Sequence, residues 1–332
     1  MLVLSGRNVN DLYYRGVNYL RDSGVEQDTR AGKVLVLNCP VMSVYERPYE
    51  RVLFDEKRDA NPFFHLMECM WMLAGRSDAA FLNIFVKDFG ERFAEEDGHI
   101  WGAYGARWRA HFSDKMSSVT LLDQLTTVIR LLTENPDDRR VVISMWDPSE
   151  DLAMAKRDVP CNTQIYPRVV QGKLDLTVMC RSNDIIWGAY GANAVHFSFL
   201  QEVLAACIGV GVGRLYQLSN NWHGYIDVMQ KQEAALSNKF YDTGMVTTRP
   251  IVNHPEVFFE EVENFCERVT DLADGEEPGY VNTFLNEVAA PMLRIHAMFR
   301  EGGARLASNY VYEIKASDWQ FACKKWLERR IK

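Results

Sequence analysis

No long hydrophobic run occurs in this sequence of 332 residues, and none approaches the roughly 18 consecutive apolar residues that a membrane-spanning helix needs. The N-terminal segment also lacks the basic and apolar pattern of a secretory signal peptide. Hydrophobic residues make up 47% and charged residues 25% of the chain, which is usual for a folded soluble protein. We therefore expect a soluble, cytoplasmic enzyme with no membrane partner.

Cysteines are few, and their spacing is uninformative. The seven cysteines are scattered, odd in number and never spaced as C-x-x-C, which argues against both a disulfide framework and a zinc site. The net charge of −8 argues against a broad surface for a nucleic acid polymer, which normally requires a basic face. A small anionic substrate stays compatible with this charge if arginines gather locally.

The chain shows no internal repeat and no low-complexity segment. Strand and helix patterns are interspersed without strict βαβ alternation, which predicts an α+β fold. We expect one large domain with a mainly antiparallel or mixed sheet flanked by helices. A catalytic core is expected over residues 1–240, with a helical C-terminal region, 241–332, packed on it.

Hydrophobic periodicity and turn residues give the expected elements. Gln171-Gly172 is expected to form a hairpin turn, and Ser317 is expected to cap the last helix. Helices are predicted over 8–22, 62–74, 119–134 and 193–208, and strands over 33–38, 41–46, 51–55, 140–146, 163–170 and 173–180.

Cys161 lies in a loop between two predicted strands, where a side chain can be exposed and yet fixed in position. A buried apolar cysteine is the commoner case. Arg139, Arg140 and Arg181 lie at the ends of predicted strands around it. Guanidinium groups suit phosphate oxygens, and a nearby cation lowers the pKa of a thiol. Together they indicate a nucleophile beside a phosphate site.

Glu68 interrupts the apolar segment FFHLMECMWML, where burying a bare carboxylate is costly. It is expected either to pair with a cation or to have a raised pKa suited to proton transfer. In NNWHGY, His223 and Tyr225 share one side of an extended segment. A purely structural histidine is the alternative there.

Six segments together resemble the thymidylate synthase family, which includes the pyrimidine nucleotide hydroxymethylases. They occur in the order of that family and fall within residues 30–225. The segments are HLMECMWMLAG (65–75), GAYGARWR (102–109), PDDRRVVISMWDPSE (136–150), PCN (160–162), RSNDIIWGAYGAN (181–193) and NNWHGY (220–225).

The resemblance implies chemical roles for four residues. Cys161 matches the nucleophile that adds to C6 of the pyrimidine. Glu68 matches the carboxylate that orders water and manages protons at C4 and C5, and Tyr104 belongs to the same network. Asn162 stands where the methylating members usually have a histidine beside the C4 oxygen.

The resemblance also implies phosphate-binding residues and a homodimer. Arg30, Arg181 and Ser182 match the phosphate binders of the same subunit. Arg139 and Arg140 match the arginines that the partner subunit contributes, so the site would be shared across the interface.

The remaining binding roles concern the sugar, the base and the folate. His223 and Tyr225 match the contacts to the sugar 3′-hydroxyl, and Asn193 matches the amide that recognises the base. Asp184 matches the aspartate that binds the pterin ring of 5,10-methylenetetrahydrofolate, the implied one-carbon donor. Phe93 falls at a position that faces the folate.

Thiolate addition to C6 makes C5 nucleophilic enough to attack the one-carbon unit of the folate. Loss of the C5 proton and of the folate then leaves an exocyclic methylene. Hydride from the folate would give a methyl group, and water would give a hydroxymethyl group. The resemblance to the thymidylate synthase family therefore leaves two possible products, a methylated and a hydroxymethylated nucleotide.

Four departures from the family favour water, and so 5-hydroxymethylation. Asn162 replaces histidine, and Gly90 and Phe93 stand where tryptophans are usual. One extra residue follows Gly188, so either Ala192 or Asn193 faces the base. The C-terminal region does not resemble the short tail that closes over the folate.

An asparagine at the base favours dUMP as the substrate, with dCMP and CMP left open. The alternative reaction is reductive methylation of dUMP by a thymidylate synthase. The product would suit either a phage genome or a nucleoside antibiotic. In the case of a phage, the enzyme would work in the host cytoplasm.

Two more distant classes are a DNA cytosine methyltransferase and a non-catalytic nucleotide-binding relative. The first also attacks C6 from a Pro-Cys dipeptide, but SGRNVND (5–11) is not the glycine-rich loop it needs. The second is disfavoured because Cys161, Glu68, Tyr104 and Asp184 are all present.

Overall fold

The computed structural model describes residues 1–112, 122–153, 155–232 and 240–331. It confirms the predicted α+β class with a mixed sheet, ordered β1-β4-β8-β7-β6-β5, with β3 also paired to β8 and β2 to β3. The β1–β4 and β7–β8 pairs are parallel, and the other pairs are antiparallel. The strands are β1 (Leu2–Gly6), β2 (Val25–Thr29), β3 (Gly32–Val36), β4 (Val41–Tyr45), β5 (Ile143–Ser144), β6 (Asn162–Val170), β7 (Lys173–Asp184) and β8 (Gly211–Tyr225).

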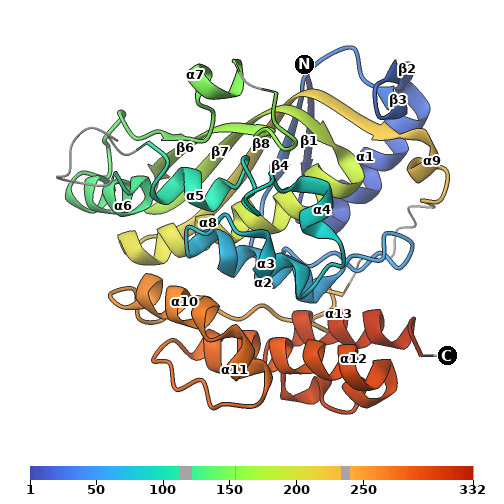
Figure 1. The fold of residues 1–332 in the computed structure, drawn as a ribbon. Helices are drawn as coiled ribbons and strands as arrows, with labels where there is room; N and C mark the ends of the chain where they lie inside the picture. The colour runs from blue at the N-terminus through green and yellow to red at the C-terminus, as the bar shows by residue number, and fades with distance from the viewer. Residues whose placement is uncertain (113–121, 154, 233–239, 332) are drawn as a thin grey trace.

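Helices cover one face of this sheet and form a further layer beyond it (Figure 1). Those of the first 230 residues are α1 (Val9–Ser23), α2 (Pro62–Leu73), α3 (Ala79–Asn83), α4 (Phe89–Phe93), α5 (Tyr104–Arg109), α6 (Gln124–Glu134), α7 (Pro148–Asp151), the π-helical turn η1 (Ile185–Ala192), α8 (Asn193–Ile208) and α9 (Ile226–Met229). The later ones are α10 (Phe258–Glu267), α11 (Val269–Ala273), η2 (Leu285–Ala289), α12 (Ala290–Ser308), η3 (Val311–Glu313) and α13 (Ser317–Glu328).

The core lies between the sheet and helices α2 and α8, which are apolar on nearly every side. In β7, Leu174, Leu176 and Val178 alternate with partly or fully exposed residues, so one face of the strand enters the core. The β6–β7 hairpin turns at Gln171 and Gly172, both with positive φ (51° and 73°), as a tight two-residue turn requires. The hairpin prediction is confirmed.

Segment 51–55 was expected to be a strand, and it is not one. Its backbone is instead satisfied by the side chain of Asn10 in α1, whose Nδ2 donates to Val52 O (2.9 Å) and whose Oδ1 accepts from Phe54 N (2.9 Å). An asparagine amide offers the same donor and acceptor as a peptide group. The segment is therefore buried without a neighbouring strand.

Other boundaries differ from the predictions by a few residues. Strands β1 and β2 and residues 211–219 of β8 were not predicted, and the expected strand over 140–146 is reduced to Ile143–Ser144. Helix α6 begins at Gln124, and the predicted start at 119–121 lies outside the described residues. Ser317 is the first residue of α13 rather than its cap, since its hydroxyl bonds to the backbone of Thr247.

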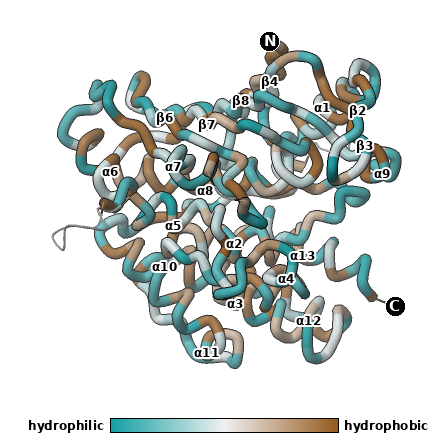
Figure 2. Tube along the Cα trace, turned by 45° about the horizontal axis from the view of Figure 1, so that its top comes forward, coloured by the Kyte–Doolittle hydropathy of each residue, from teal (hydrophilic) through white to brown (hydrophobic). Residues whose placement is uncertain are grey.

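The C-terminal region is helical, as expected, and its helices α10–α13 pack beneath α2 and α3 (Figure 1). Hydrophobic and hydrophilic residues alternate along these helices, as in helices with one buried side (Figure 2). Phe63 of α2 contacts Trp326 of α13 and His296 of α12, with ring centroids 5.5 Å apart in both pairs. The layer thus supports the helix that carries Glu68. The division at residue 240 stays a prediction.

No helix among the described residues is both long and apolar enough to cross a membrane.

Candidate active site

Cys161 lies at the end of the loop that leads into β6, and the neighbouring strand β7 holds it in place. Arg181 N donates to Cys161 O (2.8 Å), and Asn162 pairs with Cys180 in the sheet register. The Cys161 side chain is only partly exposed. Burial raises the pKa of its thiol, while the positive charge of Arg181 acts in the opposite direction. The cysteine is therefore fixed by strands and adjacent to a cation.

The side chain of Arg181 fastens the loop that precedes the cysteine. Its Nε donates to Pro160 O (2.9 Å), and its Nη2 donates to Val159 O (3.0 Å). The guanidinium group also lies over the ring of Trp146, 5.6 Å from its centroid. Two of its five N–H groups are therefore engaged with backbone, and the others can bind an anion.

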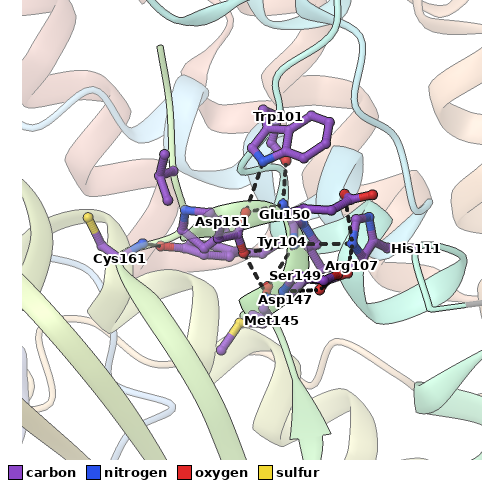
Figure 3. A network of polar contacts seen from close by, with 12 residues as sticks. Trp101, Tyr104, Arg107, His111, Met145, Asp147, Ser149, Glu150, Asp151 and Cys161 are labelled. Carbon is purple, nitrogen blue, oxygen red and sulfur yellow. Dashed lines mark hydrogen bonds and ion pairs between the residues drawn. The ribbon is translucent and has the colours of Figure 1, made fainter. Parts of the chain in front are cut away.

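Tyr104, the first residue of α5, reaches back to the nucleophile. Its hydroxyl accepts from Cys161 N (3.2 Å), Asn162 N (3.1 Å) and Asn162 Nδ2 (2.9 Å). Burial raises the pKa of Tyr104 well above its usual value, so the phenol stays protonated. Figure 3 shows its ring between Cys161 and the polar cluster around Arg107.

That cluster anchors α5 through a fully buried ion pair. Arg107 Nη2 and Nη1 donate to the two carboxylate oxygens of Asp151 (2.9 and 3.1 Å), which also accept from Trp101 Nε1 and Asp147 N (Figure 3). Every oxygen of the buried carboxylate is thus satisfied, as such a pair requires. Tyr104 and Arg107 are one turn apart, so the cluster fixes the helix face that presents the phenol.

His111, Asp147 and Glu150 bring potential metal-ligand atoms within 4.8 Å of one another. The guanidinium of Arg107 lies in the same cluster, with Nη1 3.2 Å from His111 Nε2. We therefore assign these residues to the network that anchors α5 and not to a metal site.

A chain of amides connects Tyr104 to the sheet. Asn162 Nδ2 donates to Asn193 Oδ1 (3.0 Å), Asn193 Nδ2 donates to Asn183 Oδ1 (3.0 Å), and Asn183 Nδ2 donates to Ser219 Oγ (2.9 Å). Asn162 is fully buried, and its Oδ1 has no partner among the described residues. The chain fixes the orientation of Asn193, yet leaves one donor and one acceptor site on its amide.

The extra residue before Asn193 lies within the π-helical turn η1. A π-helical turn holds more residues than an α-helical turn, so it can absorb one without changing where the following helix begins. Ala192 and Asn193 both line the cavity described next, and Asn193 starts α8. The amide of Asn193 is therefore available to the site despite the altered spacing.

A cavity of about 190 Å³ opens beside Tyr104 and Asn193. Its polar wall includes three titratable side chains, Glu68 of α2, His196 of α8 and Asp158. Glu68 Oε2 lies 2.9 Å from His196 Nε2. The carboxylate that looked misplaced in the sequence thus faces a cavity and has a histidine beside it.

The apolar wall of the cavity has two aromatic rings from α4. Phe89 and Phe93 lie with ring centroids 4.7 Å apart, and both line the cavity. A side chain at Gly90 would instead meet Ala79 and Asn83 at 3.1 and 3.2 Å, so this position faces α3. Phe89 therefore supplies the ring that seemed absent at position 90.

Asp184 closes β7 and begins η1. Its Oδ1 accepts from Ile186 N (2.9 Å) and Trp187 N (2.6 Å), which makes it the cap of the turn. Its Oδ2 is buried without a partner among the described residues, and burial raises the pKa of the carboxyl. An orphaned buried oxygen is suited to a ligand N–H donor. This fits the pterin contact expected at this residue.

His223 and Tyr225 lie near the end of β8, next to Asp184 in the register. Their ring centroids are 5.7 Å apart, and both side chains are half-buried. His223 Nδ1 lies 2.7 Å from Asn221 Oδ1. Burial lowers the pKa of His223, and the charge of Asp184 opposes that effect. The two rings thus share one side of the strand, as predicted.

The other expected phosphate binders lie apart from the cavity. Arg30 is exposed in the β2–β3 turn, and Ser182 is partly buried in β7. Arg139 and Arg140 are exposed in the loop after α6, where Arg140 pairs with Asp138 (2.7 Å). The structure therefore does not bring Arg139 and Arg140 to the Cys161 of their own chain.

Four residues of the site were not identified from the sequence: Asp158, Asn183, His196 and Phe89. Asp158 lies three residues before Cys161, and His196 interrupts an apolar helix as Glu68 does, so both carried a recognisable signal. Asn183 and Phe89 matter only through their neighbours in space.

Comparison with known proteins places this fold and site in one family. The family model for thymidylate synthase matches residues 13–266. The chain belongs to the thymidylate synthase family, and it is a one-carbon transferase acting at C5 of a pyrimidine.

Three relatives are named deoxyuridylate hydroxymethyltransferase. The protein of Pseudomonas phage M6 is 40% identical over 99% of this chain and 95% of its own length. The protein of Bacillus phage SP01 is 32% identical over 86% of this chain and 73% of its own length. The protein of Delftia phage PhiW-14 is 29% identical over 64% of this chain and 58% of its own length.

Proposed function

We propose that this enzyme transfers a one-carbon unit from 5,10-methylenetetrahydrofolate to C5 of dUMP and releases 5-hydroxymethyl-dUMP. The observation that carries the proposal is the 40% identity, over nearly the whole chain, to a relative named deoxyuridylate hydroxymethyltransferase. The cavity beside Tyr104 agrees with it, because Glu68, His196 and Asp158 face that cavity and water is the reagent that distinguishes this product from a methyl group. Since the three relatives come from phages, we place the reaction in the cytoplasm of an infected host.

In the proposed mechanism the Cys161 thiolate bonds to C6 of the base, which moves electron density to C5 and the C4 oxygen. The hydroxyl of Tyr104 would donate to that oxygen directly or through water, and Asn162, whose N–H groups bond to Tyr104 and Asn193, would hold the phenol in place. Glu68, next to His196, carries protons at C4 and C5. The first C5 bond can then form to the one-carbon unit of the folate.

The folate would be held by Asp184 and the aromatic wall. The orphaned Oδ2 of Asp184 accepts a pterin N–H, and Phe93 packs against the folate. Bound folate supplies the one-carbon unit at the oxidation level of formaldehyde. The role of the chain is to fix its orientation relative to C5.

The base preference follows from the fixed amide of Asn193. Its free N–H suits the C4 oxygen of uracil, and its free lone pair suits the uracil N3–H. Cytosine presents an amino group and an unprotonated N3 at the same positions. Its amino group would then meet the N–H of Asn193, and its N3 would meet the amide oxygen, so neither pair could form a hydrogen bond. This supports dUMP over dCMP and CMP.

The phosphate would be bound by Arg30, Arg181 and Ser182, with Arg139 and Arg140 supplied by a second subunit, and the sugar by His223 and Tyr225. The open face of the sheet supports the homodimer. Across β6, β7, β8 and β4 the register aligns Gln164, Met179, Leu218 and Met42, all of them partly exposed. Such a row on an open sheet is a surface that a second copy can cover.

Product analysis tests the proposal. The purified enzyme is incubated with methylenetetrahydrofolate and, separately, dUMP, dCMP, UMP and CMP, and the products are examined by mass spectrometry. We expect a hydroxymethyl group on dUMP with tetrahydrofolate released. A methyl group with dihydrofolate formed would instead establish a thymidylate synthase. As a control, Cys161→Ala should abolish turnover and retain nucleotide binding, and unchanged turnover would disprove the mechanism.

A further inference from the structure

Asp158 is a carboxylate that no family motif contains, yet it lines the same cavity as Glu68. It lies three residues before Cys161, and Gly102 leaves the space that it occupies. A Cβ at position 102 would lie 2.5 Å from Asp158 Oδ2 and 3.2 Å from Pro160 N. The site thus has room for a second carboxylate next to the nucleophile.

Burial and four neighbouring charges set the pKa of Asp158. Burial raises its pKa to about 6. Among the charges that face it, Arg181 of β7 and Arg107 of α5 lower that pKa, while Glu68 of α2 and Glu95 after α4 raise it. A carboxylate of this kind is a stronger base than an exposed aspartate and is still mostly ionised at neutral pH.

The two carboxylates of the cavity differ in what they contact. Glu68 Oε2 lies 2.9 Å from His196 Nε2, a ring nitrogen that can hold or share a proton. Asp158 faces the cavity from the nucleophile loop. Paired carboxylates in unlike surroundings are a recurring way to separate two proton-transfer roles.

We propose that Asp158 is the general base for the water that captures the exocyclic methylene, and that it thereby commits the site to a hydroxymethyl product. This inference rests on the proposed hydroxymethylation. The water transfers one proton to the Asp158 carboxylate as its oxygen bonds to the exocyclic carbon. The displaced electron pair moves through C5 to the C4 oxygen. It then returns to form C5=C6, breaks the C6–S bond and restores the Cys161 thiolate, and Asp158 releases the proton to solvent.

The test separates water capture from the earlier steps. The full-length wild type, Asp158→Asn and Asp158→Glu are given dUMP labelled with tritium at C5, together with methylenetetrahydrofolate. Tritium release reports C5 proton loss, and mass spectrometry reports the nucleotide product, with and without 2-mercaptoethanol as an alternative nucleophile. Glu95→Gln is the matched control, because Glu95 faces Asp158 without lining the cavity.

We expect Asp158→Asn to lower hydroxymethyl formation by about 100-fold while first-turnover tritium release stays within about threefold of wild type. Added thiol should then yield a thioether at the exocyclic carbon. Asp158→Glu should recover part of the hydroxymethylation, and Glu95→Gln should stay near wild type. In the wild type the rate of hydroxymethyl formation should rise as the pH is raised through about 6, and this rise should be absent in Asp158→Asn.

Hydroxymethylation by Asp158→Asn within about threefold of wild type would overturn the inference. So would a parallel loss of tritium release and product, because that would place Asp158 before water capture. If Asp158→Asn does not fold, the pH dependence of the hydroxymethylation rate of Asp158→Glu is the test. A pH dependence identical to that of Glu95→Gln and wild type would count against the inference. A methyl product from the wild type is a separate result that disproves the proposed function itself.

Discussion

At the scale of single residues, the site depends on how burial and a few charges set the state of each titratable group. Burial raises the pKa of the Cys161 thiol, and Arg181 opposes it. The arginine therefore has two effects, since it also holds the loop through Pro160 O and Val159 O. Charge and hydrogen bonding can be separated by substitution.

Arg181→Gln should raise the pKa of the Cys161 thiol by about one unit, because an opposite charge at close range is lost. Alkylation of Cys161 by iodoacetamide, followed by mass spectrometry against pH, measures the thiolate fraction. Arg181→Lys keeps a cation and should stay closer to wild type. Identical alkylation profiles for wild type and Arg181→Gln would contradict the electrostatic role.

Asp158 should reduce the stability of the fold at neutral pH. Its pKa is raised to about 6 in the folded protein, so the folded state binds its proton more tightly than the unfolded state. The cost of the buried charge is therefore present in full above pH 6 and is absent below the unfolded pKa of about 4. Replacing the carboxylate should relieve it.

Asp158→Asn should increase the free energy of unfolding at pH 7 by on the order of 2 kcal/mol, with the gain disappearing toward pH 4. Urea unfolding at both pH values measures it. Asp138→Asn is the control of opposite sign, since hydrogen bonds from Arg140 lower the pKa of the Asp138 carboxyl to about 2. A gain for Asp158→Asn that is the same at both pH values would contradict the linkage.

At the scale of elements, the π-helical turn η1 lies between Asp184 and Asn193, the residues that we propose bind the folate and the base. Asp184 caps its beginning with Oδ1 and keeps Oδ2 free of protein partners, while Asn193 follows its end. One oxygen of Asp184 is therefore structural, and we propose that the other binds the folate. Two substitutions can distinguish them.

Asp184→Asn should raise the KM for methylenetetrahydrofolate far more than the KM for dUMP, because an amide can still cap the turn but no longer presents a carboxylate to the pterin. Asp184→Ala should have the same kinetic effect and also lose about 1 kcal/mol of stability with the cap. Steady-state kinetics and urea unfolding measure the two effects. Equal changes in both KM values would argue against the folate role.

Elements that are regular along the chain were predictable from sequence, and those that depend on distant partners were not. Apolar periodicity sufficed for α1, α2, α8 and the β6–β7 hairpin. It failed at 51–55, because the side chain of Asn10 replaces a strand there. It also could not show that Phe89 and not position 90 faces the cavity, since that depends on how α4 packs on α3.

At the scale of the whole molecule, the sheet leaves one face open in the part of the chain that the structure describes. The row Gln164, Met179, Leu218 and Met42 crosses four strands of that face. Arg139 and Arg140 lie exposed in a loop apart from their own Cys161. Both features make sense if two copies pack through their sheets and each lends arginines to the other.

A shared site predicts complementation between two inactive variants. Cys161→Ala lacks the nucleophile and Arg140→Ala lacks a donated phosphate contact, so a mixed dimer contains one site with both residues intact. Mixing the two proteins under conditions of subunit exchange should restore activity, up to about one quarter of the wild-type value if dimers form at random. Mixing Cys161→Ala with Arg181→Ala is the control, because Arg181 and Cys161 belong to the same subunit's site. Each of the two sites in that hybrid has one of the two defects, so the control mixture should stay inactive. If the Cys161→Ala and Arg140→Ala mixture also stays inactive under subunit exchange, the result contradicts a site shared across the interface.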